Sequence, residues 1–396
     1  MEMTLRWFGT GYDSVTLEQI RQIPGVTGVI TTLYGKQPGE TWSREEIHAL
    51  KEEVEKAGLR IAGIESVNIH DAIKIGSDDR EQYIEQYIET LRHLGEEDIH
   101  LVCYNFMPVI DWIRTDLQHP WPDGTSSLYY DRIRFAYFDI RILEREGAEK
   151  DYTEEELQKV AELDKVITEA EKDALIDTII VKTQGFVNGN IKEGDKNPVS
   201  IFKRLLALYK DINRDALREN MRYFLSAIMP VCEEYGVNMC VHPDDPPFQV
   251  LGLPRIVTNE NDIEWFLNAV DNPHNGLTFC AGSLSAGEHN DTRELAKKFA
   301  KRTHFVHLRS TAAMQGGNFI ESSHLTGRGH LIDLIRIFEN ENPGLPMRVD
   351  HGRMMLGDED KGYNPGYSFH GRMLALAQVE GMMAVVDDEK RRQIIL

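Results

Sequence analysis

The chain has 396 residues, 41% of them hydrophobic and 28% charged, a composition that excludes wholesale disorder and allows a sizeable buried core. Its formal charge of -21 argues against a nucleic-acid partner, because no local run of basic residues offsets the repulsion of a polyanion. No stretch approaches about 18 uncharged apolar residues, and the first residues lack a basic region followed by an apolar core. We therefore expect neither membrane insertion nor secretion.

Eight short apolar segments, rich in β-branched and aromatic residues, recur along the chain and are too short for helices. We expect β-strands at residues 4–9, 25–32, 59–66, 99–106, 237–243, 276–282, 303–310 and 346–352. Helical patterns lie between most of these segments. The alternation predicts an α/β fold, a (β/α)8 TIM barrel formed by a single domain over residues 1–396.

The connector between the second and third predicted strands carries the clearest helix signal. Ser43 and Glu46 form a capping box ahead of apolar residues at helical spacing, and Gly58 stands where a C-terminal cap belongs. Further amphipathic helices are expected near residues 83–94, 215–235, 260–270, 291–301 and 330–339.

The interval between the fourth and fifth predicted strands is much longer than the others. It predicts a mostly helical insertion over residues 107–200, with a turn at 120–127, a charged helix opened by the capping box Thr153 to Glu156, and a flexible loop at 184–198. Such an insertion could cover the active face as a lid, or could serve packing or contacts in a homo-oligomer such as a dimer. The sequence does not choose between these roles.

Four cysteines, Cys103, Cys232, Cys240 and Cys280, are widely spaced and include no CxxC pair. They are too few for a disulfide framework in a chain of this length, so we expect a reducing, cytoplasmic environment. Every thiol then stays available as a ligand, although we interpret the first three as structural.

Functional groups of such barrels gather at the C-terminal ends of the strands. The last four predicted strands end in His242, Cys280, His307 and Asp350. Neighbouring strands lie about 5 Å apart, so these four side chains could converge on one ion. Two imidazoles, a thiolate and a carboxylate suit Fe(II), Mn(II), Co(II) or Zn(II) better than Mg(II) or Ca(II). Each residue alone would have an ordinary structural role, and only their joint placement favours a metal site.

Two residues near this site are candidates for proton transfer. If the eighth strand ends at Asp350, the alternation of side chains between strand faces no longer applies to His351. Gly352 then permits a sharp change in chain direction that turns the imidazole over the cavity. Tyr367 follows in a turn beyond the same strand, where a nearby cation would have to lower the pKa of its phenol before it could act as a base. An ordinary loop aromatic is an equally good interpretation of Tyr367.

Arg309 lies two residues beyond His307, on the same face, where its guanidinium could bind a substrate carboxylate. Asn105, at the end of the fourth predicted strand, could bind a hydroxyl group, and Glu65 at the end of the third could do the same. Asp244 and Asp245 are flanked by prolines, which favours a rigid turn that holds His242.

The motifs RWFG, IESVNIH, VCYNFMPVIDW, VHPDDPP, GLPRIV, TFCAGS, HLRS, DHGR and NPGYS, in this order, resemble the mannonate dehydratase family of hexuronate degradation over nearly the whole chain. Val349 departs from the proline expected before DHG. The resemblance implies a xylose-isomerase-like barrel that converts D-mannonate to 2-keto-3-deoxy-D-gluconate and water, using Fe(II) or Mn(II). It places the metal ligands at His242, Cys280, His307 and Asp350, with His351 and Tyr367 as the proton-transfer pair.

Two alternatives remain open on the sequence alone. A metal-dependent sugar isomerase or epimerase on the same barrel also begins with proton abstraction beside an activated carbon, so fold analogy does not separate it from a dehydratase. A non-catalytic binder of sugar acids that kept the ion is the alternative from a different class of protein.

Overall fold

The structure, a computed structural model, describes residues 1–183, 191 and 194–395. Most of the loop expected at 184–198 lies outside these residues. Within them, no helix is both long enough and apolar enough to cross a membrane.

Eight parallel strands close into a barrel in the order β1-β12-β9-β8-β7-β4-β3-β2. Every predicted strand overlaps one of them, which confirms the (β/α)8 barrel. The strands are β1 Glu2–Arg6, β2 Val26–Thr31, β3 Arg60–Glu65, β4 Leu101–Tyr104, β7 Asn238–Val241, β8 Asn275–Cys280, β9 Thr303–His307 and β12 Pro346–Arg348. Most end earlier than predicted, because the polar residues that follow leave the hydrogen-bonded ladder and line a cavity.

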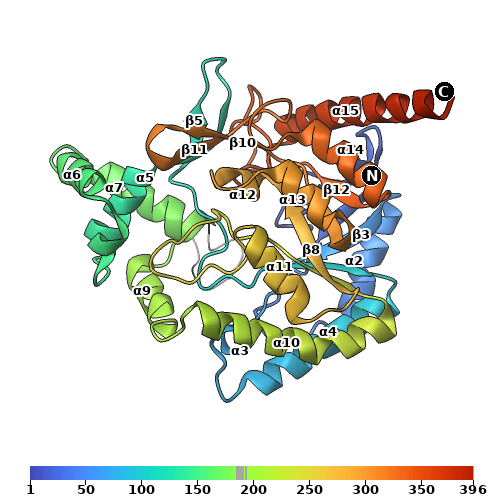
Figure 1. Cartoon of the computed structure of the whole chain (residues 1–396), viewed down its shortest axis with the longest axis horizontal. Helices are drawn as coiled ribbons and strands as arrows, with labels where there is room; N and C mark the ends of the chain where they lie inside the picture. Colours follow the sequence, from blue (N-terminus) through green and yellow to red (C-terminus); the bar gives the residue numbers. More distant parts are fainter. Residues whose placement is uncertain (184–190, 192–193, 396) are drawn as a thin grey trace.

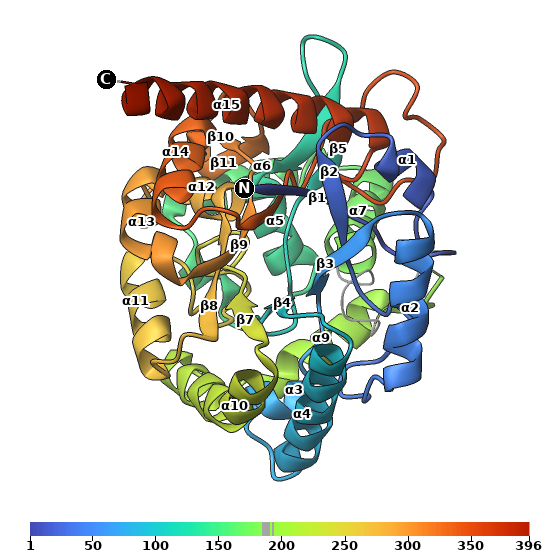
Figure 2. The same ribbon diagram turned by 90° about the vertical axis from the view of Figure 1, so that its right-hand side faces the viewer.

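Helices surround this barrel (Figure 2), and the C-terminal helix α15 belongs to this outer ring, beside α14. They are α1 Leu17–Arg21, α2 Arg44–Lys56, α3 Asp71–Ile75, α4 Arg80–Glu96, α10 Arg214–Tyr235, α11 Glu260–Ala269, α12 Ala281–Ala286, α13 Thr292–Phe299, α14 Leu331–Glu341 and α15 Phe369–Ile395. The capping box predicted at Ser43 and Glu46 starts α2, which buries Ile47, Leu50 and Val54 against the strands. All six connector helices expected from the sequence are present.

A second apolar core lies mostly in the segment between β4 and β7 and includes residues such as Leu251 and Phe319 from outside it. The helices of this segment are α5 Arg132–Tyr137, α6 Glu154–Leu163, α7 Glu169–Ile176 and α9 Pro198–Leu208, joined by π-helical turns at Phe138–Ile142 and Asp177–Lys182 and a 3-10 turn at Ala148–Asp151. The predicted capping box at Thr153 and Glu156 starts α6.

A second, antiparallel sheet was not predicted. It has the order β10-β11-β6-β5 and joins the hairpin β5 Asp116–Pro120 and β6 Ser126–Tyr130 to the hairpin β10 Thr311–Met314 and β11 Asn318–Glu321. The sequence correctly indicated the turn between β5 and β6. The flanking strands are short and partly polar, and they are paired with a segment far away in the chain, so no local pattern marked them. Figure 1 shows this sheet beside the barrel, between α12 and the helices of the segment.

Candidate functional site

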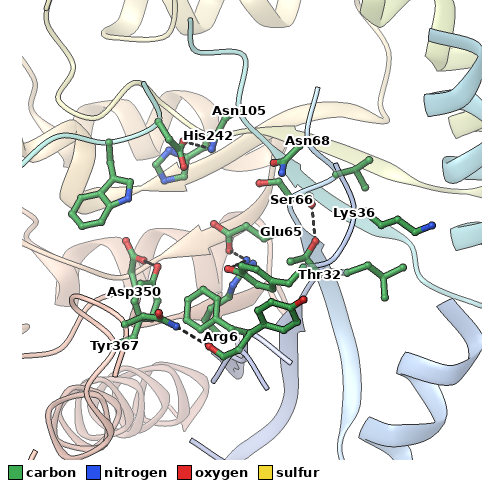
Figure 3. Close-up of a pocket in the computed structure, with 18 of the residues that line it drawn as sticks. Arg6, Thr32, Lys36, Glu65, Ser66, Asn68, Asn105, His242, Asp350 and Tyr367 are labelled. Atoms are coloured by element: carbon green, nitrogen blue, oxygen red, sulfur yellow. Dashed lines mark hydrogen bonds and ion pairs between the residues drawn. The ribbon is translucent and has the colours of Figure 1, made fainter. Parts of the chain in front are cut away.

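A cavity of about 490 Å³ opens at the C-terminal ends of the barrel strands. Its wall combines acidic, basic and aromatic side chains from both halves of the barrel. Among them are Glu65, Asn105, His242, Asp350, His351 and Tyr367. In Figure 3, His242 and Asn105 lie on one side of this cavity and Asp350 and Tyr367 on another.

Three of the four predicted metal ligands converge here. One ligand atom from each of His242, Cys280 and His307 lies within 4.8 Å of the other two. Cys280 and His307 are the last residues of β8 and β9, whose register pairs them directly, and His242 follows β7. Nδ1 of His242 donates to the carbonyl oxygen of Pro243 at 2.7 Å, so Nε2 is the nitrogen that would bind a metal ion after losing its proton.

The electrostatics of this cluster favour the charged forms of both Cys280 and His242. Burial alone would raise the pKa of the Cys280 thiol, but Arg309 and His242 hold that pKa well below its usual value, so the sulfur is a thiolate. Burial opposes charge on His242 as well, and the Cys280 thiolate beside it raises the imidazole pKa to about 9. Nδ1 of His307 is buried and has no hydrogen-bond partner among the described residues. A thiolate and two imidazoles at this separation fit a divalent transition ion.

The fourth predicted ligand, Asp350, lies beside the cluster rather than within it. Its Oδ2 is 3.8 Å from Nδ1 of His307 and 2.7 Å from Nε of Arg309, and its Oδ1 accepts from Arg348. Burial alone would raise the pKa of the Asp350 carboxyl, but Arg348 and Arg309 hold that pKa well below its usual value. Its role as a ligand stays a prediction.

The turn that brings Asp350 and His351 to one cavity differs from the expectation. Strand β12 ends at Arg348, and Asp350 itself adopts the left-handed conformation with φ 61°, which an aspartate tolerates better than most residues. Gly352 supplies no positive φ. It is needed because a Cβ there would come within 2.5 Å of the backbone of Gly371 and Arg372.

Both predicted proton-transfer residues line the cavity. Nδ1 of His351 lies 2.9 Å from both carboxylate oxygens of Glu321, and its ring centroid lies 5.1 Å from that of Tyr367. The Tyr367 hydroxyl lies 3.4 Å from Oδ1 of Asp350. Burial raises the pKa of Tyr367 well above its usual value, against the opposing effect of Arg348, so the phenol is protonated.

The predicted substrate-binding residues have protein partners. Arg309 directs Nη1 at Glu321, Nη2 at Asp245 and Nε at Asp350, so a substrate carboxylate would have to replace one of these partners. Asn105 lines the cavity and donates from Nδ2 to Asp111. Neither contact tests the predicted roles.

Several residues at this site were not singled out from the sequence. Arg348 forms a bidentate pair with Glu65, at 2.9 and 2.8 Å. Arg114 lies just before β5, and Glu321 ends β11 of the second sheet. Neither directly follows a predicted barrel strand, so no pattern in the sequence was a reason to select them. Asp245, interpreted as part of a turn, also forms ion pairs with Arg114 and Arg309. Its neighbour Asp244 accepts backbone N–H groups as a turn residue does, and it pairs with Arg255.

A closed (β/α)8 barrel with such a cavity defines a xylose-isomerase-like TIM barrel, and a xylose isomerase domain protein from Planctomyces limnophilus shares the fold, with a TM-score of 0.51 at 9% identity over 98% of this chain and 99% of that one. Residues 1–393 match the family model described as D-mannonate dehydratase (UxuA). The chain belongs to the mannonate dehydratase family, which confirms the resemblance seen in its motifs.

Individual relatives agree with this assignment. The mannonate dehydratase of Brachyspira hyodysenteriae is 41% identical over 389 residues, 98% of this chain and 99% of the relative. That of Thermotoga petrophila is 39% identical over 396 residues, 99% of each chain. The crystal structure of mannonate dehydratase from Streptococcus suis serotype 2 superposes with a TM-score of 0.77 at 33% identity, over 98% of this chain and 94% of that one.

Proposed function

We propose that this protein dehydrates D-mannonate to 2-keto-3-deoxy-D-gluconate and water. The observation that carries the proposal is the cluster of His242, Cys280 and His307, in a chain of this family. His242 of this cluster lines the same cavity as His351 and Tyr367. A sugar acid fits such a cavity, because its hydroxyl and carboxylate groups match the charged and polar wall.

His242, Cys280, His307 and Asp350 would hold Fe(II) or Mn(II), and the donor set does not choose between these ions. When bound, the ion supplies positive charge that stabilises the enediolate-like charge developing next to the substrate carboxylate.

Dehydration removes a proton from C2 and hydroxide from C3. The C2 hydrogen is very weakly acidic and needs a positioned base, and hydroxide leaves only as it receives a proton. His351 and Tyr367, whose rings are in contact, are proposed to perform these two proton transfers. The enol product then tautomerises to the ketone. The phenol of Tyr367 is protonated, which favours Tyr367 as the acid at C3 and His351 as the base at C2.

The order of the pair is tested by isotope exchange in D2O. If His351 is the base, H351Q abolishes exchange of the C2 hydrogen, whereas Y367F retains exchange but forms no product. The opposite pattern establishes Tyr367 as the base.

Arg309 and Asn105 are proposed to bind the substrate carboxylate and a hydroxyl group. For Arg309 this requires an exchange of partners, since all three of its nitrogens face carboxylates. The expected signature of R309M and N105A is a raised KM.

The activity is tested by incubating the metal-loaded protein with D-mannonate and detecting the 2-keto-3-deoxy acid with thiobarbiturate. An epimer formed without loss of water would establish the isomerase or epimerase alternative, and binding without turnover would establish a sugar-acid binder. A cytoplasmic location and a homo-oligomer such as a dimer remain predictions.

A further inference from the structure

We propose that Glu321 is a positioning residue for His351: it fixes the imidazole in the tautomer with the proton on Nδ1, so that Nε2 faces the substrate. This inference rests on the proposed function for its catalytic consequence. Its structural part concerns one hydrogen bond and can be tested without substrate.

The contact between the two side chains is direct and buried. Nδ1 of His351 lies 2.9 Å from each carboxylate oxygen of Glu321, while Nε2 lies 3.6 Å from Oδ1 of Asp350. An ionised carboxylate only accepts hydrogen bonds, so Nδ1 must carry the proton. The neutral ring then has its lone pair on Nε2, the nitrogen available for a proton from substrate.

Glu321 is in turn fixed by a closed ring of four buried charges. Arg114 donates from Nη2 to Oε1 of Glu321 at 2.7 Å and pairs with Asp245 at 2.8 Å. Arg309 donates from Nη1 to the same Oε1 and from Nη2 to Asp245 at 2.9 Å. The four side chains alternate in sign and sum to zero, so each buried charge has opposite charges on both sides.

The second sheet holds the backbone of Glu321. Glu321 ends β11 opposite Thr311, and the hydroxyl of Ser127 on β6 donates to its carbonyl oxygen at 2.8 Å. The hairpin of β5 and β6, inserted between β4 and β7, therefore holds Glu321, and Glu321 in turn orients His351 after the last barrel strand.

The geometry makes E321Q a sharp test. Both arginines donate to Oε1, so in E321Q the amide oxygen should stay with them and the amide nitrogen should occupy the place of Oε2. That nitrogen is a donor 2.9 Å from Nδ1 of His351. Oε1 lies at the same distance but already accepts from both arginines, so E321Q favours the tautomer with the proton on Nε2. One isosteric change thus reverses the tautomer.

The tautomer is read from ¹⁵N-histidine NMR spectra of the zinc-loaded protein, chosen because zinc is diamagnetic. Among the 14 histidines, H351Q identifies the signal of His351 by its loss. Wild type should show the proton on Nδ1 and E321Q on Nε2. The same proton position in both proteins overturns the inference, whether or not D-mannonate is a substrate.

The catalytic consequence is read separately. E321Q should lower kcat about 100-fold with KM within about threefold of wild type, because the ring is still present but in the wrong tautomer. A kcat of E321Q within twofold of wild type would contradict the catalytic role of Glu321. If wild type itself does not turn over D-mannonate, the proposed function fails while the NMR result still decides the role of Glu321.

Two further variants complete the design. D262N is the control, since Asp262 is a buried acid paired with Arg214 and Arg218 away from this cavity, and it should change neither kcat nor the His351 signal. E321Q leaves one positive charge uncompensated and could prevent folding. The double variant R114M/E321Q keeps the ring neutral, retains Arg309 on the amide oxygen, and should show the same reversed tautomer.

Discussion

Nε of Arg309 lies 2.7 Å from Oδ2 of Asp350, and Nη2 of the same side chain lies 3.4 Å from Sγ of Cys280. One guanidinium therefore partners two of the four proposed metal ligands. A divalent ion bound by these groups would supply the same positive charge, so the site is arranged to keep both donors ionised and ready to coordinate.

Removal of one donor should weaken metal binding. We expect H307A and C280S to bind Mn(II) more than about 10-fold less tightly than wild type, as measured by titration calorimetry. Added metal should also raise the Tm of wild type and not that of H307A, because only a state that binds the ion is stabilised by it. C232A is the control: Cys232 is buried on α10, outside the cluster, and its loss should leave metal affinity unchanged.

Loss of the Tyr367 hydroxyl should abolish turnover without unfolding the protein. Y367F keeps the ring that packs edge-on against Phe8 at 4.8 Å, and removes only the proton-transfer group. We expect kcat to fall by at least about 100-fold. Y130F is the matched control, since Tyr130 is also buried but stacks on Phe319 away from the cavity. Equal activities of the two variants would remove Tyr367 from the mechanism.

Gly366 should be needed for the orientation of His351. A Cβ at Gly366 would come 2.9 Å from Cδ2 of His351, and the residue has φ +82°. Gly362 has φ +69° with no heavy atom within 4 Å, so G362A introduces only the backbone strain, worth about 1 kcal/mol. We expect kcat to fall about 10-fold or more in G366A and to stay near wild type in G362A. Steady-state kinetics of the two variants, beside their urea unfolding curves, separates displacement of His351 from general destabilisation.

Stability should fall between pH 6.5 and 4 because of His304 on β9. Burial lowers the pKa of its imidazole from 6.5 to about 4, against the opposing effect of a hydrogen bond with the backbone of Pro273. The unfolded chain therefore binds the proton first, so this stability is complete above pH 6.5 and is lost as the pH falls toward 4. This difference between the pKa of His304 in the unfolded and folded states corresponds to about 3 kcal/mol of unfolding free energy.

Urea unfolding at pH 7 and pH 4 measures this dependence. H304L should remove about 3 kcal/mol of it, since leucine has no proton to bind. H100Q serves as the control, because the ring of His100 is about half exposed, at 49% of its side chain. Identical pH dependence in wild type and H304L would show that other groups cause the loss.

The sequence by itself determined the barrel and the positions of its ligand-capable residues. Alternating strand and helix patterns are local, since each depends on residues within one turn or one pleat of each other. The rule that such barrels present functional groups at strand ends then placed His242, Cys280 and His307 together, and the structure brings their ligand atoms within 4.8 Å. The motif resemblance supplied the family in the same way, from residues read in order.

Only the tertiary structure decided which partners these residues have. Glu321 reaches His351 because β11 pairs with β6, and Arg114 reaches Asp245 because the segments after β4 and β7 lie side by side. These segments share no local pattern. The departure expected at Gly352 begins instead at Asp350, which has a positive φ, while Gly352 is needed for the close approach of the Gly371 backbone. Ion pairs and close backbone contacts depend on distances between remote segments, and these distances exist only after the chain has folded.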